Sequence, residues 1–449
     1  MKQTIKTIIT MMLLLSAVTI DGLAAGKITL VPSSLGDITC DRSDAESGTT
    51  VTLTLTGKKD KDYTYKAKEA VITVQYDPSA ASGRTRNDEI PLRQGVVKYD
   101  VQSTDDNVSV YTFTMPDGDV KVEATFEVVT VNEENVSNGT LTIENNDITD
   151  LGDAVFKPYG SDLKYIDLTS TKLDDVKIDR TSGAFQGVSE KTLIYLPSTA
   201  SPATDSDLKN VILSDGTCTE LLLAEDAIVP KAIKASKVTF DRDFVQNRYS
   251  TVFLPFSIPE SEASQLGTFH LFQGISEGQA QFSEAVTGDI KAETPYVFIP
   301  KNNEKISVNQ SVSIAITTGT DEKTNVNASG KLVGTFNEIT FGTGAGQKSP
   351  ANIYGFADDN NKGVGARTFV KVKAGATIAP FRAYLEVTGT AGARLEYSVS
   401  FGSDDTTGIS TVKTDDDATW YSIDGRRLSG QPSTKGIYIK NGKKTVINK

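Results

Sequence analysis

The chain has 449 residues, more than the ~250–300 that one hydrophobic core usually serves, so several domains are expected. It carries 58 acidic and 46 basic residues, a formal net charge of −12, without a cluster of Lys and Arg. Because such a chain repels phosphate groups, neither nucleic acid nor an anionic membrane surface is expected as a partner. The single histidine and two distant cysteines exclude a multi-histidine metal site within one chain, and we expect no histidine-based catalysis.

Residues 1–25 have the order of a secretory signal peptide. Lys2 and Lys6 precede an apolar run over residues 8–20, and small residues follow up to Ala25. The run is shorter than the ~20 residues of a membrane-spanning helix, and no later segment approaches that length. We therefore expect an exported chain without direct membrane insertion, either associated with the cell surface at the outer membrane or secreted.

Residues 26–130 alternate between apolar and polar positions, as an antiparallel β domain does. Two such alternating runs flank Pro116-Asp117-Gly118, which predicts two strands joined by a tight turn. The string from Tyr111 to Phe126 resembles the end of the divergent internalin B-repeat module, a small β-grasp-like unit of bacterial surface proteins. The resemblance implies a stalk or spacer and no site residue.

Residues 131–236 contain an imperfect repeat of the pattern L-x-x-L-x-L-x-x-N-x-L. It fits four times, at spacings of 25, 27 and 28 residues, within the ~20–29 of a leucine-rich repeat. The stretch resembles the short, degenerate repeats of surface leucine-rich proteins, which implies a short leucine-rich-like β solenoid. We expect its fourth positions to form one buried column, made of Leu141, Ile166, Leu193 and Leu221.

The third and fifth positions of each copy are expected to point away from this column. They are Tyr165, Asp167, Thr192, Ile194, Glu220 and Leu222. The four that can make polar or aromatic contacts are the candidate ligand-binding residues: Tyr165, Asp167, Thr192 and Glu220. The alternative is that a neighbouring domain covers this face, because Ile194 and Leu222 are apolar.

Residues 237–402 carry short strand-like runs separated by turns rich in Gly and Asn, which suits a β-sandwich. The runs are 238–240, 251–254, 296–299, 312–316, 383–387 and 395–399. The segments 249–256 and 293–297 resemble a recurring β module that follows such repeats in surface proteins of Gram-negative anaerobes.

The last part of the chain reads as a polar linker, residues 403–418, and a small β module, residues 419–449. Asp424-Gly425 and Asn441-Gly442 lie between short apolar runs and favour hairpin turns. The run from Trp420 resembles the C-terminal modules of type IX secretion cargo and their abbreviated relatives, although the first strand of the full sorting domain is missing. That resemblance implies a tail that directs the chain to its location.

The sequence assigns no catalytic, cofactor-binding or metal-binding residue. We expect His270 to be a strand residue with a satisfied hydrogen bond, and Cys40 and Cys218 to be separate thiols. The Asp358–Gly363 segment is a weak calcium candidate that a solvated turn explains better. Carboxylate-only glycoside hydrolysis needs two acids at ~5–9.5 Å, which the composition does not exclude.

These observations favour a mainly β, multidomain protein of the cell surface or extracellular space. The leading hypothesis is a non-enzymatic protein, without cofactors, that adheres to or recognises an extracellular protein or glycan. The alternatives are an extracellular carbohydrate-active enzyme with paired carboxylates and a structural subunit of a surface assembly. A deep cleft with facing carboxylates would favour the enzyme, and an exposed repeat face would favour binding.

Overall fold

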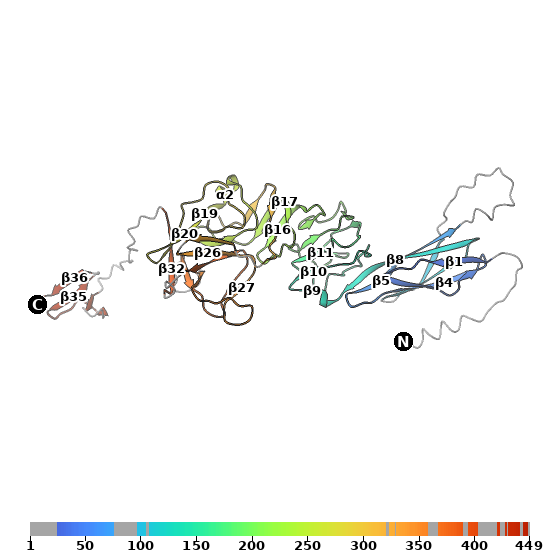
Figure 1. Ribbon diagram of the computed structural model, residues 1–449, viewed down its shortest axis with the longest axis horizontal. Helices are drawn as coiled ribbons and strands as arrows, with labels where there is room; N and C mark the ends of the chain where they lie inside the picture. Colours follow the sequence, from blue (N-terminus) through green and yellow to red (C-terminus); the bar gives the residue numbers. More distant parts are fainter. Residues whose placement is uncertain are drawn as a thin grey trace. The chain divides into compact units, whose positions relative to one another are not determined.

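The computed structural model describes residues 25–75, 97–104, 107–319, 323–327, 329–357, 367–388, 394–402, 420–422, 427–428, 430–440 and 443–447 (Figure 1). Among these residues the structure is mainly β, with 49% strand and one α-helix, α2 (Glu260–Leu266), which confirms the predicted mainly β class. The chain divides into two compact units, one ending at Val399 and one beginning at Ser400. No helix within the described ranges is long and apolar enough to cross a membrane.

The first part of the chain forms two four-stranded sheets, with orders β3-β1-β8-β5 and β2-β4-β7-β6. The strands are β1 (Gly26–Leu30), β2 (Gly36–Cys40), β3 (Asp44–Ala45), β4 (Thr50–Gly57), β5 (Tyr63–Gln75), β6 (Tyr99–Thr104), β7 (Val108–Thr114) and β8 (Asp119–Val131). Apolar residues at alternate positions of β4 and β5, such as Leu53 and Ile72, are fully buried in one cluster, which we name the first core. Strand alternation thus buries one face of each sheet.

The predicted turn at Pro116-Asp117-Gly118 connects the two sheets. Gly118 has φ of 106°, a backbone conformation that a residue without Cβ adopts at little cost. The strand before the turn, β7, pairs with β4 and β6, whereas β8 pairs with β1 and β5. The two strands are therefore joined by the turn but are not partners of each other.

The next sheet is built from very short strands in the order β15-β13-β11-β10-β9. They are β9 (Val136–Ser137), β10 (Thr140–Thr142), β11 (Tyr165–Asp167), β13 (Leu193–Tyr195) and β15 (Val211–Ile212). The last four are parallel, and β9 is antiparallel to β10. A second parallel pair, β12 (Asp175–Val176) with β14 (Ser201–Pro202), lies in the intervening segments.

The register of this sheet corrects the predicted repeat. Leu141 faces Ile166, Ile166 faces Ile194, and Ile194 faces Val211, and all four are buried in the first core. Leu193 is fully buried as expected, but it belongs to a different cluster, the second core. A shift of one residue along a strand moves a side chain to the other face. The predicted column is thus right for two copies and displaced by one residue in the third.

The fourth copy is also placed differently from the prediction. Leu221 is buried in the second core and lies on β16 (Thr217–Ala224), which pairs in parallel with β17 (Ile233–Asp241). Two antiparallel strands, β23 (Ile306–Val308) and β24 (Val312–Ile314), complete this sheet on the far side of β17. The predicted domain boundary between residues 236 and 237 therefore falls inside a strand, and the second core runs across it.

The remaining strands up to residue 402 form three further sheets. The first has the order β18-β22-β19, with β18 (Ser250–Phe253), β19 (Gly267–His270) and β22 (Pro295–Pro300). The largest has the order β20-β21-β32-β29-β28-β31-β26-β25, with β20 (Phe272–Ser276), β21 (Gln279–Phe282), β25 (Lys323–Asn327), β26 (Gly330–Thr335), β28 (Ile353–Phe356), β29 (Thr368–Lys371), β31 (Arg382–Val387) and β32 (Glu396–Phe401). The third pairs β27 (Ile339–Thr340) with β30 (Thr377–Ile378). All six strand-like runs predicted in this region overlap observed strands.

The C-terminal unit contains a small antiparallel sheet of order β34-β33-β35-β36. Its strands are β33 (Trp420–Ser422), β34 (Arg427–Leu428), β35 (Gly436–Lys440) and β36 (Lys443–Ile447). Trp420 is buried and contacts the ring of Tyr438 edge to face. The predicted turns at Asp424-Gly425 and Asn441-Gly442, the linker and the signal peptide up to residue 24 lie outside the described residues.

Candidate functional site

The predicted ligand-binding face is largely covered. Thr192 is fully buried, and its hydroxyl donates a hydrogen bond of 2.6 Å to the carbonyl of Leu163. The carboxylate of Asp167 is also buried and lies 2.7 Å from the ammonium group of Lys231, in the segment between β16 and β17. Thr192 and Asp167 are therefore structural, and the expectation of an exposed face is wrong for them.

The other two predicted residues do not restore an open surface. Tyr165 is half-buried, packs against the second core and contacts the ring of Tyr195 edge to face. Glu220 remains partly exposed on β16, with its carboxylate 3.7 Å from the Lys237 ammonium group. Tyr165 and Asp167 lie opposite Leu193 and Tyr195 on neighbouring strands, and the latter two side chains point into the second core, which covers this side of the sheet. Ile194, one of the two apolar residues that had indicated a covered face, points instead into the first core, so the strand register divides the predicted face between the two cores.

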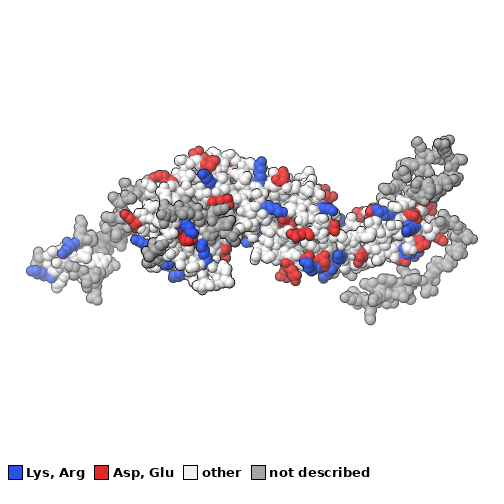
Figure 2. All heavy atoms as spheres, viewed as in Figure 1, with Lys and Arg blue, Asp and Glu red and all other residues white. Residues whose placement is uncertain are grey.

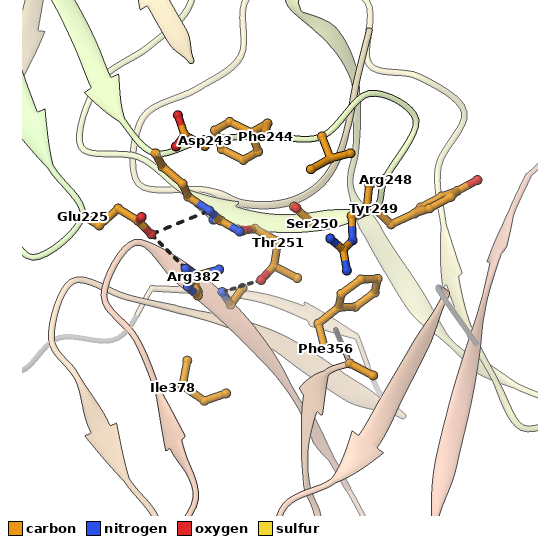
Figure 3. Close-up of a pocket in the computed structure, with 14 residues that line it drawn as sticks. Glu225, Asp243, Phe244, Arg248, Tyr249, Ser250, Thr251, Phe356, Ile378 and Arg382 are labelled. Atoms are coloured by element: carbon orange, nitrogen blue, oxygen red, sulfur yellow. Dashed lines mark hydrogen bonds and ion pairs between the residues drawn. The ribbon is translucent and has the colours of Figure 1, made fainter. Parts of the chain in front are cut away.

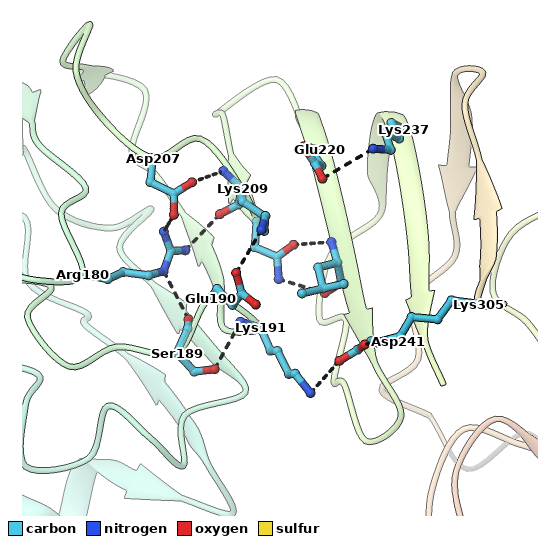
Figure 4. A network of polar contacts seen from close by, with 12 residues as sticks. Arg180, Ser189, Glu190, Lys191, Asp207, Lys209, Glu220, Lys237, Asp241 and Lys305 are labelled. Carbon is cyan, nitrogen blue, oxygen red and sulfur yellow. Dashed lines mark hydrogen bonds and ion pairs between the residues drawn. The ribbon is translucent and has the colours of Figure 1, made fainter. Parts of the chain in front are cut away.

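A network of charged side chains links the segments before β13 and β15 with β16 and β17 (Figure 4). Arg180 donates hydrogen bonds to the carbonyls of Ser189 and Lys209 and is paired with Asp207. Each basic group in the network has an acidic partner, so the network carries little net charge. It joins successive turns of the chain and does not form a basic surface.

Asp241 holds two lysines in the same network. Its carboxylate lies 2.5 Å from the Lys191 ammonium group and is also paired with Lys305 (Figure 4). Burial alone would raise the pKa of Asp241, but the hydrogen bonds from Lys191 and Lys305 outweigh it and lower the pKa. The three groups connect the segments just before β13 and β23 with the end of β17, which indicates a stabilising role.

The best candidate site is a cavity of about 290 Å³ that we name the arginine pocket (Figure 3). Its lining includes Arg242, Arg248 and Arg382, together with Glu225. Glu225 immediately follows β16, the first two arginines lie between β17 and β18, and Arg382 begins β31. The pocket is thus assembled from segments more than 150 residues apart in the sequence.

Strained backbone and buried aromatic rings fix the position of Arg382. The preceding residue, Phe381, has φ of 58°, which is unusual for a bulky side chain. Its backbone is held at both ends, because its N–H donates to Thr335 and its carbonyl accepts from Phe253. The fully buried Phe381 ring packs on Phe240 at 5.4 Å between centroids. Strain held in this way is common at ligand sites.

Two guanidinium groups in the pocket share one carboxylate. The Nη2 of Arg382 donates to Oε2 of Glu225 at 2.8 Å, and the Nε of Arg242 lies 3.8 Å from the same oxygen (Figure 3). Arg242 is only 7% exposed, donates from Nη1 to the Thr251 carbonyl at 2.9 Å, and lies over the Phe244 ring. Burial, and then the charge of Arg382, lower the pKa of Arg242, while Glu225 opposes this shift.

This arrangement leaves positive charge and donors for a ligand. A guanidinium has five N–H donors, and among the described residues Arg242 makes one hydrogen bond. The other acid beside the pocket, Asp243, has a side chain that is 92% exposed and is 3.9 Å from Lys305, so solvent and that lysine screen its charge. The pocket is therefore suited to an anionic group.

The histidine and the cysteines take structural positions. His270 ends β19 with Nδ1 2.9 Å from the Ser283 carbonyl and Nε2 3.0 Å from the Thr268 hydroxyl, as the prediction of a hydrogen-bonded strand residue requires. Burial lowers the pKa of His270, against the opposing effect of the Ser283 hydrogen bond. Cys40 and Cys218 are free, and burial raises the pKa of the Cys218 thiol to about 12, which keeps it neutral.

Other sequence candidates contribute no site. The weak calcium candidate at Asp358–Gly363 lies outside the described residues. Within the described ranges, no group of three or more His, Cys, Asp or Glu side chains could hold a metal ion. The arginine pocket was missed because no motif links Arg242 with Arg382. The one available signal was the charged triplet Asp241-Arg242-Asp243 set between Phe240 and Phe244.

The chain was also compared with known proteins. No family model, no curated protein and no solved structure matches it.

Proposed function

We propose that this chain is a non-enzymatic recognition protein of the cell surface or extracellular space, and that it holds its ligand in the arginine pocket. The observation that carries the proposal is the shared carboxylate. Two guanidinium groups converge on Glu225 in a cavity that opens to solvent, so one positive charge lacks a matching acid. Burial of the Arg242 guanidinium costs free energy, and buried groups with a perturbed pKa are concentrated at functional sites.

The proposal includes a modular architecture. We interpret residues 26–130 as an internalin B-repeat-like spacer, the parallel strands β10 to β15 as a short leucine-rich-like solenoid, and residues 237–402 as a β-sandwich. Residues 419–449, which include the small sheet of β33 to β36, are interpreted as a type IX secretion-like delivery module. In such a chain, spacers and repeats present a binding unit away from the cell, and sites are grafted onto the framework.

The contacts of Glu225 and Asp243, the two acids that line the pocket, favour recognition over carboxylate-based catalysis. Glycoside hydrolysis needs one carboxylic acid and one carboxylate that face the same bond. Glu225 is instead engaged by both guanidinium groups, and the Asp243 side chain points to solvent. Binding of an anion, by contrast, needs only the guanidinium groups that are already in the pocket.

Two measurements test the proposal. Cells of the native host and their culture fluid are fractionated and probed for the chain, which is expected in the outer membrane or the medium. The purified chain is then applied to an array of extracellular glycans and peptides, with Arg382→Gln as the comparison. Binding that Arg382→Gln abolishes supports the proposal. A chain that stays in the cytoplasm, or whose array binding is unchanged in the variant, contradicts it.

A further inference from the structure

We infer that the arginine pocket binds the carboxylate of an acidic sugar residue, and that Arg382 is the residue that selects for the charge. This inference rests on the proposed function, since it names the ligand class of the same site. It is carried by the Arg242–Glu225–Arg382 arrangement, by the size of the cavity and by the side chains around it.

The charge of the pocket favours an anion at short range only. Its two inner guanidinium groups face one carboxylate, while the whole chain has a net charge of −12. At physiological ionic strength the field of distant charges is screened beyond ~8 Å, so the local excess of positive charge decides what enters. A second carboxylate beside Glu225 would also relieve the repulsion between Arg242 and Arg382.

The geometry favours a carboxylate over a spherical anion. A guanidinium presents parallel N–H donors in a planar fork that matches the two oxygens of a carboxylate. Arg382 keeps 35% of its side chain exposed, and its one ion pair among the described residues uses Nη2. Its remaining donors are therefore available at the mouth of the cavity. Arg242, which is held by Thr251, supplies the buried floor.

The lining favours a sugar over the end of a peptide. The hydroxyl residue Ser250 and the apolar side chains of Phe356 and Ile378 line the same cavity (Figure 3). A sugar ring offers both matching surfaces, hydroxyl groups on its edge and C–H groups on its face. The volume of about 290 Å³ lies at the lower limit of ~300–1,000 Å³ for small-molecule sites, which suits a single ring.

The test uses the purified full chain in isothermal titration calorimetry with sodium D-glucuronate and with the methyl ester of D-glucuronic acid. The ester keeps the ring and loses the charge, so it is expected to bind at least tenfold more weakly. Arg382→Gln should weaken glucuronate binding by about tenfold or more, and Arg382→Lys by less, because lysine keeps the charge without the fork. Lys237→Gln removes the same charge from an exposed pair on β17 and should leave binding unchanged.

A second variant covers the case in which Arg382→Gln disturbs the fold. Glu225→Gln removes the competing carboxylate, so glucuronate should bind more tightly, and weaker binding would contradict the inference. Equal binding of the acid and its ester would also overturn it. The alternative ligand, a peptide C-terminus, is tested with acetyl-triglycine, whose carboxylate is free, and with its uncharged amide. Binding of that peptide without binding of glucuronate would refute the sugar ligand and leave the proposed recognition function standing. Absence of any binding on the array of glycans and peptides would contradict both the sugar ligand and the recognition function.

Discussion

Ile166 and Ile194 lie opposite each other on the parallel strands β11 and β13, and both side chains are fully buried in the first core. Leu193, one residue before Ile194, points into the second core on the other side of the same sheet. The sheet is therefore buried on both faces at this point, which is why three consecutive apolar residues occupy β13. Strand β13 therefore separates the two cores and contributes side chains to each of them.

This relationship predicts which core residues are energetically coupled. Ile166→Ala should lower the free energy of unfolding by ~2–5 kcal/mol, as should Ile194→Ala. The double variant of Ile166 and Ile194 should deviate from additivity by ~0.5–3 kcal/mol, because the two side chains are in register. Chemical denaturation of the single and double variants measures this.

Leu193→Ala provides the matched comparison. It should be as destabilising as the other two, but its double variant with Ile166→Ala should be closer to additive, since the side chains lie on opposite faces. Leu208→Ala, at a site 42% exposed, should have only a small effect. Coupling of Ile166 to Leu193 and not to Ile194 would show that the register is the one first predicted from the repeat.

Removing the shared carboxylate of the arginine pocket should destabilise the fold. Glu225→Ala leaves Arg242 and Arg382 without their common counter-charge, at a site that is partly open to solvent. We expect a loss of about 1–2 kcal/mol, between the values for exposed and buried pairs. Thermal unfolding checks this, with Glu220→Ala as control, because its exposed pair with Lys237 should contribute less than ~1 kcal/mol. An equal loss in both variants would argue against a special role for Glu225.

Acid should weaken the contact that Asp241 makes with two lysines. Its pKa is lowered in the folded chain, so its contribution to stability is present above the ordinary Asp pKa of ~3.9 and is lost as pH falls through the folded value. The free energy of unfolding should therefore fall below about pH 4, and Asp241→Asn should flatten that dependence. Asp243→Asn, at a side chain 92% exposed, should retain the wild-type profile.

The C-terminal unit should be separable from the rest. Deleting residues 419–449 removes the sheet that contains Trp420, which belongs to the unit that begins at Ser400. The melting temperature of the remaining chain should change by no more than a few degrees, while the protein should accumulate elsewhere in its host. A large fall in the melting temperature together with unchanged localisation would show that the tail is structural.

The purified protein should contain no stoichiometric zinc, iron or copper. The chain has one histidine and two free cysteines, and its described carboxylates form no cluster that could bind a metal ion. His270→Ala should also leave ligand binding intact, because both ring nitrogens are occupied by hydrogen bonds within the fold. Elemental analysis that finds one transition metal per chain would reopen the enzyme hypothesis.

Local patterns predicted the strands well because alternation is a property of a few neighbouring residues. The buried sets of β4 and β5, the strands on either side of Gly118 and the six runs after residue 237 were all visible in this way. The repeat was visible too, but its register was not. Leu193, Ile194 and Tyr195 are all apolar, so a repeat pattern cannot tell which of them faces which core.

What the sequence did not predict depends on contacts between distant segments. The pairing of β16 with β17 carries the second core across a position that looked like a boundary. Lys231, in the segment between these strands, also covers Asp167, whereas Thr192 is buried with its hydroxyl on the Leu163 carbonyl, and the pattern alone left both residues exposed. The arginine pocket joins Glu225, Arg242 and Arg382 through a strained turn at Phe381, and no short motif records such a junction.

Antiparallel strands at both ends of the series of parallel strands restrict where a further strand could be added. A parallel bridge between Lys209 and Glu220 links the sheet that ends at β15 with β16. At one end of the linked strands β10 is paired with the antiparallel strand β9, and at the other β17 is paired with β23 and β24. Sheets that end in an open parallel edge invite another copy to add on, and here those positions are taken by the chain itself. A further parallel strand could therefore join this order only as an insertion between β10 and β17, and not by addition at either end.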